Sequence, residues 1–218
     1  MDEGGTVAVV GAGIVGVAAA IHLRRAGREV VLIDRDGPAA GASEGNGGVL
    51  ACAAVVPVPG PGLLAKAPRM LLDPDQPLFV KWSRLPRLAP WLVRFLRHAN
   101  AADARRTADA LAPLVGDSVE EHQALAAGTG AERFVVPSDY AFLYPDRAAF
   151  EAEAFGWDIR RAHGYVPEEL EGPAVRAWDP AFAESLGFAA RLPGHGRITD
   201  PGAYVRALAA HAEREGVR

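Results

Sequence analysis

A glycine-rich turn near the N-terminus constrains this chain more than any other feature. Thr6–Val10 is a short, mainly β-branched apolar run, the composition of a strand buried on both faces. It leads into Gly11-Ala12-Gly13-Ile14-Val15-Gly16 and then into a helix-like stretch that ends before Gly27. A second apolar run, Val30–Ile33, ends at Asp34. Strand, glycine turn, helix, strand and acid form the context in which a Gly-x-Gly-x-x-Gly motif binds a dinucleotide.

Each glycine of this first glycine segment (residues 11–16) has a steric role in that interpretation. Gly11 permits a tight turn, Gly13 lets the backbone approach a pyrophosphate, and Gly16 lets the helix pack closely on the strand. The N–H groups at the start of the helix attract the phosphates. Asp34 is expected to accept hydrogen bonds from ribose hydroxyls, with Arg35 beside it as a further candidate. The acid disfavours NADP, but the motif alone does not distinguish FAD from NAD.

A second glycine-rich segment follows the acid. Gly41-Ala42-Ser43-Glu44-Gly45-Asn46-Gly47-Gly48 is small, polar and too long for a simple loop between a strand and a helix. In an NAD domain the chain would normally turn promptly into the next crossover helix. This second glycine segment (residues 41–48) suits a cofactor that extends beyond its pyrophosphate, and it therefore favours FAD. The alternative is a flexible surface loop.

Composition argues against several classes of protein. The formal net charge of −4 argues against a nucleic-acid-binding chain. The single cysteine, Cys52, excludes an internal disulfide and a thiolate zinc site, and we expect it to be buried as a small hydrophobe. No two histidines stand at metal-ligand spacing, so we predict no metal site. The acidic N-terminus does not resemble a signal peptide, which favours a cytoplasmic protein.

The middle of the chain mixes helical and strand-like patterns. Helices are predicted for residues 91–98, 105–114, 118–127 and 147–163, the third opening on a capping box of Ser118 and Glu121. Strands are predicted for residues 133–136, 140–144 and 185–192, with turns at 137–139 and 168–170.

A basic amphipathic stretch lies between residues 81 and 106. It holds seven basic residues against one acid, Asp103: Lys81, Arg84, Arg87, Arg94, Arg97, Arg105 and Arg106. Such a stretch, bearing a tryptophan, can lie on an anionic membrane surface. The alternative is a helix packed on its own domain with a solvated polar face. Both interpretations stay open at this point.

The two glycine segments together resemble the D-amino-acid-oxidase-like superfamily of FAD-dependent oxidoreductases, and within it the bacterial D-amino acid dehydrogenases. The resemblance continues through residues 63–82, 85–100 and 198–204. It implies that the first glycine segment binds the FAD pyrophosphate and that Asp34 binds ribose. It also implies that Ser43, Asn46 and Gly48 lie against the flavin half of FAD. Gly47 stands where members of the family often have alanine.

The resemblance implies an α/β fold with a Rossmann-like FAD-binding domain and an α+β substrate domain. It places residues 1–60 and 196–218 in the FAD-binding domain and residues 61–195 in the helical segment and substrate domain. The sheet of the substrate domain is expected to form a wall above the flavin. Candidates for that wall are Tyr140, Tyr144, Trp178 and His195, with ordinary packing as the alternative explanation for each.

The implied activity is oxidative deamination of D-amino acids to keto acids and ammonia, with hydride transfer to the flavin. The implied partners are a small amino acid and a quinone or respiratory-chain acceptor, with peripheral contact through residues 81–106 on the inner face of the bacterial inner membrane. Three alternatives stay open: a glycine or sarcosine oxidase-like enzyme, a non-catalytic nucleotide-binding fragment, and an NAD-dependent dehydrogenase.

The last residues predict a helix and the start of a strand. Asp200 is a predicted N-cap with Pro201 at the first helical position, and Gly216 ends the helix. Val217-Arg218 then begins a strand-like pattern. In the resembled family the remaining cofactor strands and the part of the active site that binds the substrate carboxylate come later. We therefore expect a C-terminally incomplete fold, with catalytic residues beyond residue 218.

Overall fold

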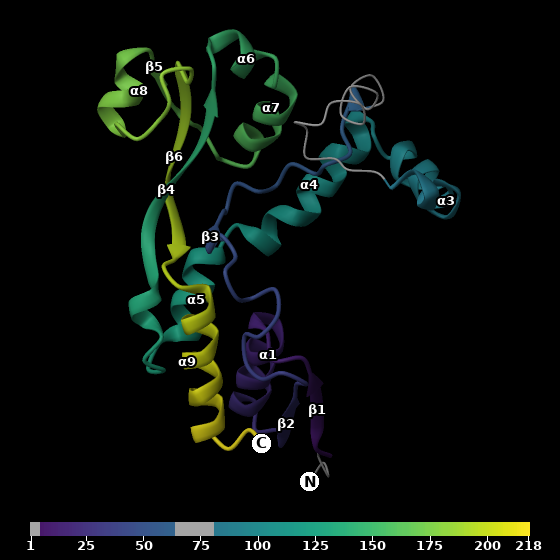
Figure 1. Cartoon of the computed structure of the whole chain (residues 1–218), viewed down its shortest axis with the longest axis vertical. Helices are drawn as coiled ribbons and strands as arrows, with labels where there is room; N and C mark the ends of the chain where they lie inside the picture. The colour runs from purple at the N-terminus through teal and green to yellow at the C-terminus, as the bar shows by residue number, and fades with distance from the viewer. Residues whose placement is uncertain (1–4, 64–80) are drawn as a thin grey trace. The chain divides into compact units, whose positions relative to one another are not determined.

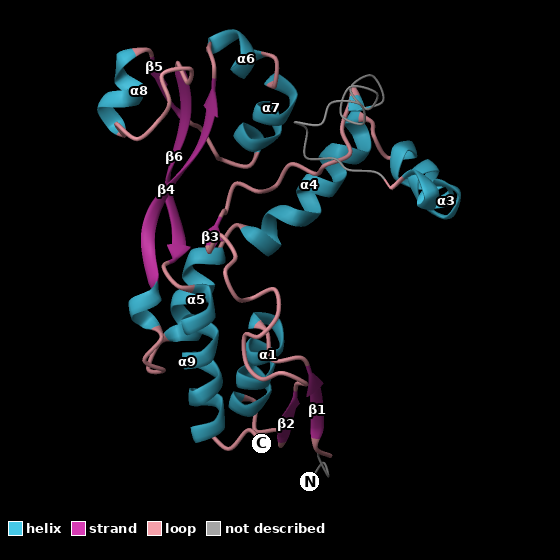
Figure 2. Cartoon of the chain, in the orientation of Figure 1, coloured by secondary structure: helices cyan, strands magenta, loops and turns pink. Residues whose placement is uncertain are grey.

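A computed structural model describes residues 5–63 and 81–218 (Figure 1). The chain divides into two compact units. Unit 1 comprises Met1–Ala51, Asp117–Phe142 and Arg191–Arg218, and unit 2 comprises Cys52–Gly116 and Leu143–Ala190. Both units combine helices with strands (Figure 2), as the predicted α/β class requires.

Unit 1 begins with the predicted βαβ arrangement. β1 (Val7–Val10) and β2 (Val30–Ile33) are parallel, and α1 (Ile14–Arg25) connects them. The register runs from Val7 opposite Val30 to Val10 opposite Ile33. α1 buries Val17, Ala20 and Ile21, and these small and branched side chains let the helix lie close to the two strands.

A second long helix, α9 (Pro201–Arg214), packs beside α1 in unit 1 (Figure 1). The carboxylate of Asp200 accepts a hydrogen bond from the backbone N–H of Ala203 at 2.8 Å, which confirms the predicted N-cap. After α9, the N–H of Arg218 donates to the carbonyl of Val30 at 3.1 Å, and the N–H of Leu32 donates to the carbonyl of Arg218 at 2.7 Å. The predicted strand-like start at the last residues therefore pairs with β2.

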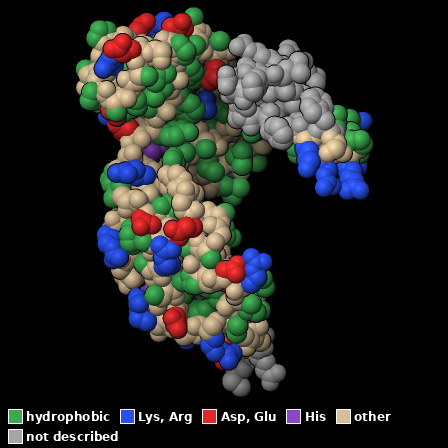
Figure 3. All heavy atoms as spheres, viewed as in Figure 1, with side chains coloured by type: hydrophobic (Ala, Val, Ile, Leu, Met, Phe, Trp, Pro, Cys, Tyr) green, Lys and Arg blue, Asp and Glu red, His purple; other side chains and the backbone are tan. Residues whose placement is uncertain are grey.

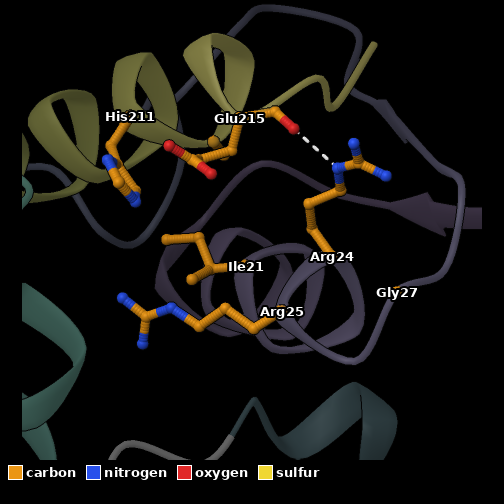
Figure 4. Close-up of a pocket in the computed structure, with 7 residues that line it drawn as sticks. Ile21, Arg24, Arg25, Gly27, His211 and Glu215 are labelled. Atoms are coloured by element: carbon orange, nitrogen blue, oxygen red, sulfur yellow. Dashed lines mark hydrogen bonds between the residues drawn. The ribbon is translucent and has the colours of Figure 1, made fainter.

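Arg24 joins the last turns of α1 and α9 (Figure 4). Its Nε donates to the backbone carbonyl of Glu215 at 2.6 Å, which satisfies a carbonyl that a helix end otherwise leaves without a partner. A cavity of about 360 Å³ lies beside this contact, and His211 and Ile21 are among the residues that line it.

The second sheet places β3 (Val49–Leu50), β6 (Phe188–Ile198) and β4 (Val135–Tyr144) next to one another in that order, and β5 (Glu168–Glu171) also pairs with β6. β3 is antiparallel to β6. The turn predicted at 137–139 is wrong, because β4 is one unbroken strand. Pro137 is tolerated there because β4 ends the strand order, so one of its edges needs no hydrogen-bond partner. The turn predicted at 168–170 is also wrong, since these residues lie in β5.

Among the described residues, the remaining helices are α3 (Leu85–Arg97), α4 (Ala101–Val115), α5 (Ser118–Ala126), α6 (Arg147–Glu151), α7 (Ala154–Ala162) and α8 (Pro173–Trp178), with 3₁₀ turns at Trp82–Arg84 and Glu132–Phe134. The predicted helix at 147–163 is interrupted between α6 and α7, where the carboxylate of Glu153 accepts a hydrogen bond from Tyr144. Ser118 is not an N-cap, because it is the first helical residue and Asp117 precedes it without a side-chain cap.

The core of unit 2 contains an aromatic cluster. Phe150 stacks on Phe188 with ring centroids 4.6 Å apart, and Trp157 is fully buried beside them. Cys52 is buried in this unit, as predicted. No helix in the described part of the chain is long and apolar enough to cross a bilayer.

The two compact units do not coincide with the predicted domains. Residues 117–142 lie in unit 1 with the first glycine segment, whereas the sequence prediction placed them within 61–195. The assignment of residues 1–60 and 196–218 to the cofactor, and of residues 61–195 to the substrate, stays a prediction.

Candidate functional site

The first glycine segment makes a tight connection from β1 to α1. Gly11 has φ +103°, a left-handed conformation that favours glycine, and its N–H donates to the carbonyl of Ile33 at 2.7 Å. A Cβ on Gly16 would overlap the carbonyl oxygen of Gly11. Because that oxygen belongs to the backbone, Gly16 must stay glycine for α1 to start where it does.

The N-terminus of α1 is suited to an anion. Gly13 is its N-cap and contributes no side-chain hydrogen bond, and the first turn contains no acidic residue. The hydroxyl of Ser43 accepts a hydrogen bond from the N–H of Ile14 at 2.9 Å. The structure therefore brings the second glycine segment directly onto the start of the helix that follows the first.

Asp34 braces the end of β2 through three backbone groups. One carboxylate oxygen accepts from the N–H of Ala12 at 2.7 Å, and the other accepts from the N–H groups of Asp36 and Gly37 at 2.8 and 3.0 Å. These hydrogen bonds, that from Ala12 first, lower the pKa of Asp34 from its ordinary value. A carboxylate has lone pairs for further donors, so the predicted contact with ribose hydroxyls remains compatible with this bracing.

A groove of about 540 Å³ opens beside Asp34. Gly11 and Ile33 line it from the C-terminal ends of β1 and β2, and Ala40 and Gly41 line it from the following loop. Arg35 also lines the groove, with an exposed side chain that pairs with Asp36 at 2.7 Å. Ligands of parallel α/β sheets bind at this end of the strands.

The second glycine segment is held by its own side chains. The amide oxygen of Asn46 accepts from the N–H of Gly48 at 2.9 Å, and its amide nitrogen donates to the carbonyls of Ala42 and Ser43 at 3.2 and 3.3 Å. Gly48 has φ +61°, and a Cβ there would overlap the carbonyl oxygen of Ile198. The segment is therefore an ordered turn packed on the end of β6 rather than an unconstrained surface loop. Gly47 lies between Asn46 and Gly48, the two residues that make these contacts.

A pocket of about 200 Å³ lies against the second glycine segment, entirely within unit 1. Ser43, Asn46 and Gly48 line one part of it, and His122 of α5 and Tyr204 of α9 line another. Sequence reasoning did not assign His122 to the site, since it was one of six scattered histidines without a motif. Its place is revealed by its contact with Tyr204, which lies 82 positions later in the chain.

The four residues predicted for a substrate wall are divided between the two units. Tyr140 stacks on His195 at 5.6 Å in unit 1. Tyr144 belongs to unit 2, where its hydroxyl donates to Glu153 at 2.9 Å. Trp178 lies in α8 of unit 2, against Phe182. Their proposed role toward a substrate stays a prediction.

Comparison with known proteins assigns this arrangement to a family. Residues 6–218 match the sequence model of the family described as FAD dependent oxidoreductase (DAO). A D-amino-acid oxidase of Bradyrhizobium diazoefficiens is 37% identical over 221 residues, covering 100% of this chain and 52% of the relative. D-amino acid dehydrogenase 2 of Ralstonia nicotianae is 35% identical over 183 residues, covering 83% of this chain and 43% of the relative. The chain thus spans about half the length of these relatives.

Among solved structures, glycine oxidase from Bacillus cereus is similar with a TM-score of 0.58. Its sequence is 19% identical, and the match covers 97% of this chain and 44% of that structure. At this level of identity the similarity concerns the fold alone.

The substitution Asp34→Asn tests the bracing of β2. An amide at this position presents an N–H group to backbone N–H groups that need an acceptor. The pKa of Asp34 is lowered in the folded state, so the ionised carboxylate stabilises the fold. This stabilisation is fully present above roughly pH 4 and is lost as the pH falls through the lowered pKa. We expect the variant to be less stable than wild type at neutral pH, with a difference that shrinks in acid, as measured by urea-unfolding midpoints.

Asp36→Asn is the matched control, because the Asp36 carboxylate contacts the exposed Arg35 side chain. Its midpoint should stay near that of the wild type at every pH. An Asp34→Asn midpoint equal to wild type at neutral pH would contradict the bracing role.

Proposed function

Because the chain belongs to the family of FAD-dependent oxidoreductases, we propose that its two glycine segments hold FAD and that the whole protein uses FAD to oxidise D-amino acids. The hydrogen bond from the Ile14 N–H to the Ser43 hydroxyl carries this proposal. It joins the two segments at the N-terminus of α1, where one extended cofactor can contact both.

The described residues fit FAD in three parts. The start of α1, with glycine at its N-cap and no acidic residue in its first turn, suits the pyrophosphate. The groove beside Asp34 and Arg35 suits the ribose and adenine. The pocket lined by Ser43, Asn46 and Gly48 suits the flavin half. Gly11, Ala12 and Val15 complete the turn, and Ala42 and Gly47 complete the second segment.

Bound FAD supplies the acceptor for a hydride from the substrate. The residues described here bind and orient that cofactor, which is the protein's share of such chemistry. D-amino acids are the proposed substrates because two relatives are named D-amino-acid oxidase and D-amino acid dehydrogenase. A glycine oxidase-like activity is the alternative. Reduction of an electron-accepting dye by the whole protein with D-alanine, glycine or sarcosine as substrate distinguishes the two.

The substitution Gly13→Val tests the placement of the pyrophosphate. A Cβ on Gly13 would lie 3.1 Å from the Ser43 hydroxyl, and the branched side chain would occupy the space before the start of α1. We expect wild-type chain to quench FAD fluorescence on titration and the variant to lose this binding while its circular dichroism stays unchanged.

Gly5→Val is the control, since a Cβ there meets nothing within 4 Å. Wild-type chain that binds NAD in preference to FAD would contradict the choice of cofactor. Wild-type flavin binding by Gly13→Val would contradict the placement.

We also propose that the protein is cytoplasmic and contacts the inner face of the bacterial membrane through α3, with a quinone or respiratory acceptor as electron partner. α3 has no fully buried residue. Helical spacing puts Leu88, Trp91 and Phe95 on one side, with Trp91 55% exposed and stacked on Phe95 at 4.9 Å. In Figure 3, lysine and arginine side chains gather next to hydrophobic ones at the position of α3. These features are typical of helices that lie in a membrane interface.

Replacing Arg87, Arg94 and Arg97 with glutamine tests the membrane contact. Each basic residue near an anionic surface contributes about 1 kcal/mol, so three replacements should weaken binding by on the order of 100-fold. Co-sedimentation with phosphatidylglycerol-containing vesicles measures this, and pure phosphatidylcholine vesicles should bind the protein less. The same replacement at Arg25, Arg28 and Arg176 is the charge-matched control. Equal sedimentation of the α3 variant and wild type would contradict the proposal.

A further inference from the structure

We propose that His122 is a flavin-binding residue, which Tyr204 orients toward the pocket beside the second glycine segment. This inference rests on the proposed function, because it concerns the flavin half of the same FAD site. It adds a polar group from α5, an element outside both glycine segments.

The position of His122 follows from its contacts within unit 1. Its Nδ1 lies 3.0 Å from the hydroxyl oxygen of Tyr204, and the two rings lie 5.7 Å apart. Tyr204 is only 1% exposed and packs edge-on against Phe134 at 6.5 Å. Because packing fixes the tyrosine, its hydroxyl in turn fixes the direction of the imidazole ring.

The hydroxyl of Tyr204 determines which nitrogen of His122 carries the proton. Burial raises the pKa of Tyr204 to about 12, so the hydroxyl keeps its proton at neutral pH. Burial lowers the pKa of His122, which keeps the imidazole neutral. The hydroxyl donates to the backbone carbonyl oxygen of His122 at 3.3 Å, and a carbonyl can only accept. The Nδ1–H group of His122 therefore donates to the hydroxyl oxygen at 3.0 Å, and Nε2 of the neutral ring is left as an acceptor.

The Nε2 lone pair is available to a ligand. Within residues 5–63 and 81–218, the side-chain hydrogen bond of His122 is made at Nδ1, and no bond to Nε2 is present. His122 is half-buried and lines the same pocket as Ser43, Asn46 and Gly48. A flavin N–H group or a ribityl hydroxyl is a donor from which Nε2 can accept.

His122→Leu removes the acceptor and keeps an apolar side chain between α5 and α9. We expect the Kd for FAD to rise about 3–10-fold, the loss for one neutral hydrogen bond, and the absorption spectrum of the bound flavin to change. His122→Gln keeps an acceptor in its amide oxygen and should recover most of the affinity and the wild-type spectrum. Tyr204→Phe keeps the packing but releases the imidazole, so it should also alter the spectrum of bound flavin.

His211→Leu is the matched control, because His211 lines the cavity beside Arg24 and not the pocket of the second glycine segment (Figure 4). It should leave FAD affinity and spectrum unchanged. Wild-type affinity and spectrum in both His122→Leu and Tyr204→Phe would overturn the inference and leave FAD binding itself intact. A loss in His122→Leu that His122→Gln does not recover would also overturn it, since the role is then packing. Failure of the wild-type chain to bind FAD would instead overturn the proposed function.

Discussion

The close approach of α1 to the carbonyl oxygen of Gly11 is the constraint on which unit 1 depends. Only glycine at position 16 allows it, because a Cβ there would overlap a backbone atom that has no room to move. This approach places the first N–H groups of α1 where the hydroxyl of Ser43 reaches Ile14 at 2.9 Å. It also places Ala12 where its N–H reaches Asp34 at 2.7 Å. One steric requirement thus aligns β2, α1 and the second glycine segment around one helix N-terminus.

The parts of the fold that depend on local sequence were predictable. Parallel pairing of β1 and β2 follows from two short apolar runs joined by a helix, and the Asp200 cap follows from a residue type with a known local hydrogen bond. The sequence interpretation brought the two glycine segments to one cofactor, and the hydrogen bond from the Ile14 N–H to the Ser43 hydroxyl is compatible with it. Their shared site stays a prediction.

The parts that depend on distant contacts were not predictable. β4 runs unbroken through Pro137 because of its place at the end of the strand order, and no local pattern contains that information. The predicted helix at 147–163 is divided into α6 and α7, and between them Glu153 accepts a hydrogen bond from Tyr144, which lies before that helix. His122 lines the pocket beside the second glycine segment and contacts Tyr204, 82 residues later in the chain, so neither periodicity nor motif spacing could predict its position.

The central claim is that one FAD molecule contacts both glycine segments. Amide hydrogen–deuterium exchange of the purified chain, measured with and without saturating FAD, tests it most directly. The account predicts slower exchange in peptides covering residues 11–18 and 41–50, with unchanged exchange in α4 of unit 2. Saturating FAD binding that leaves both glycine segments exchanging at their free rates would contradict it.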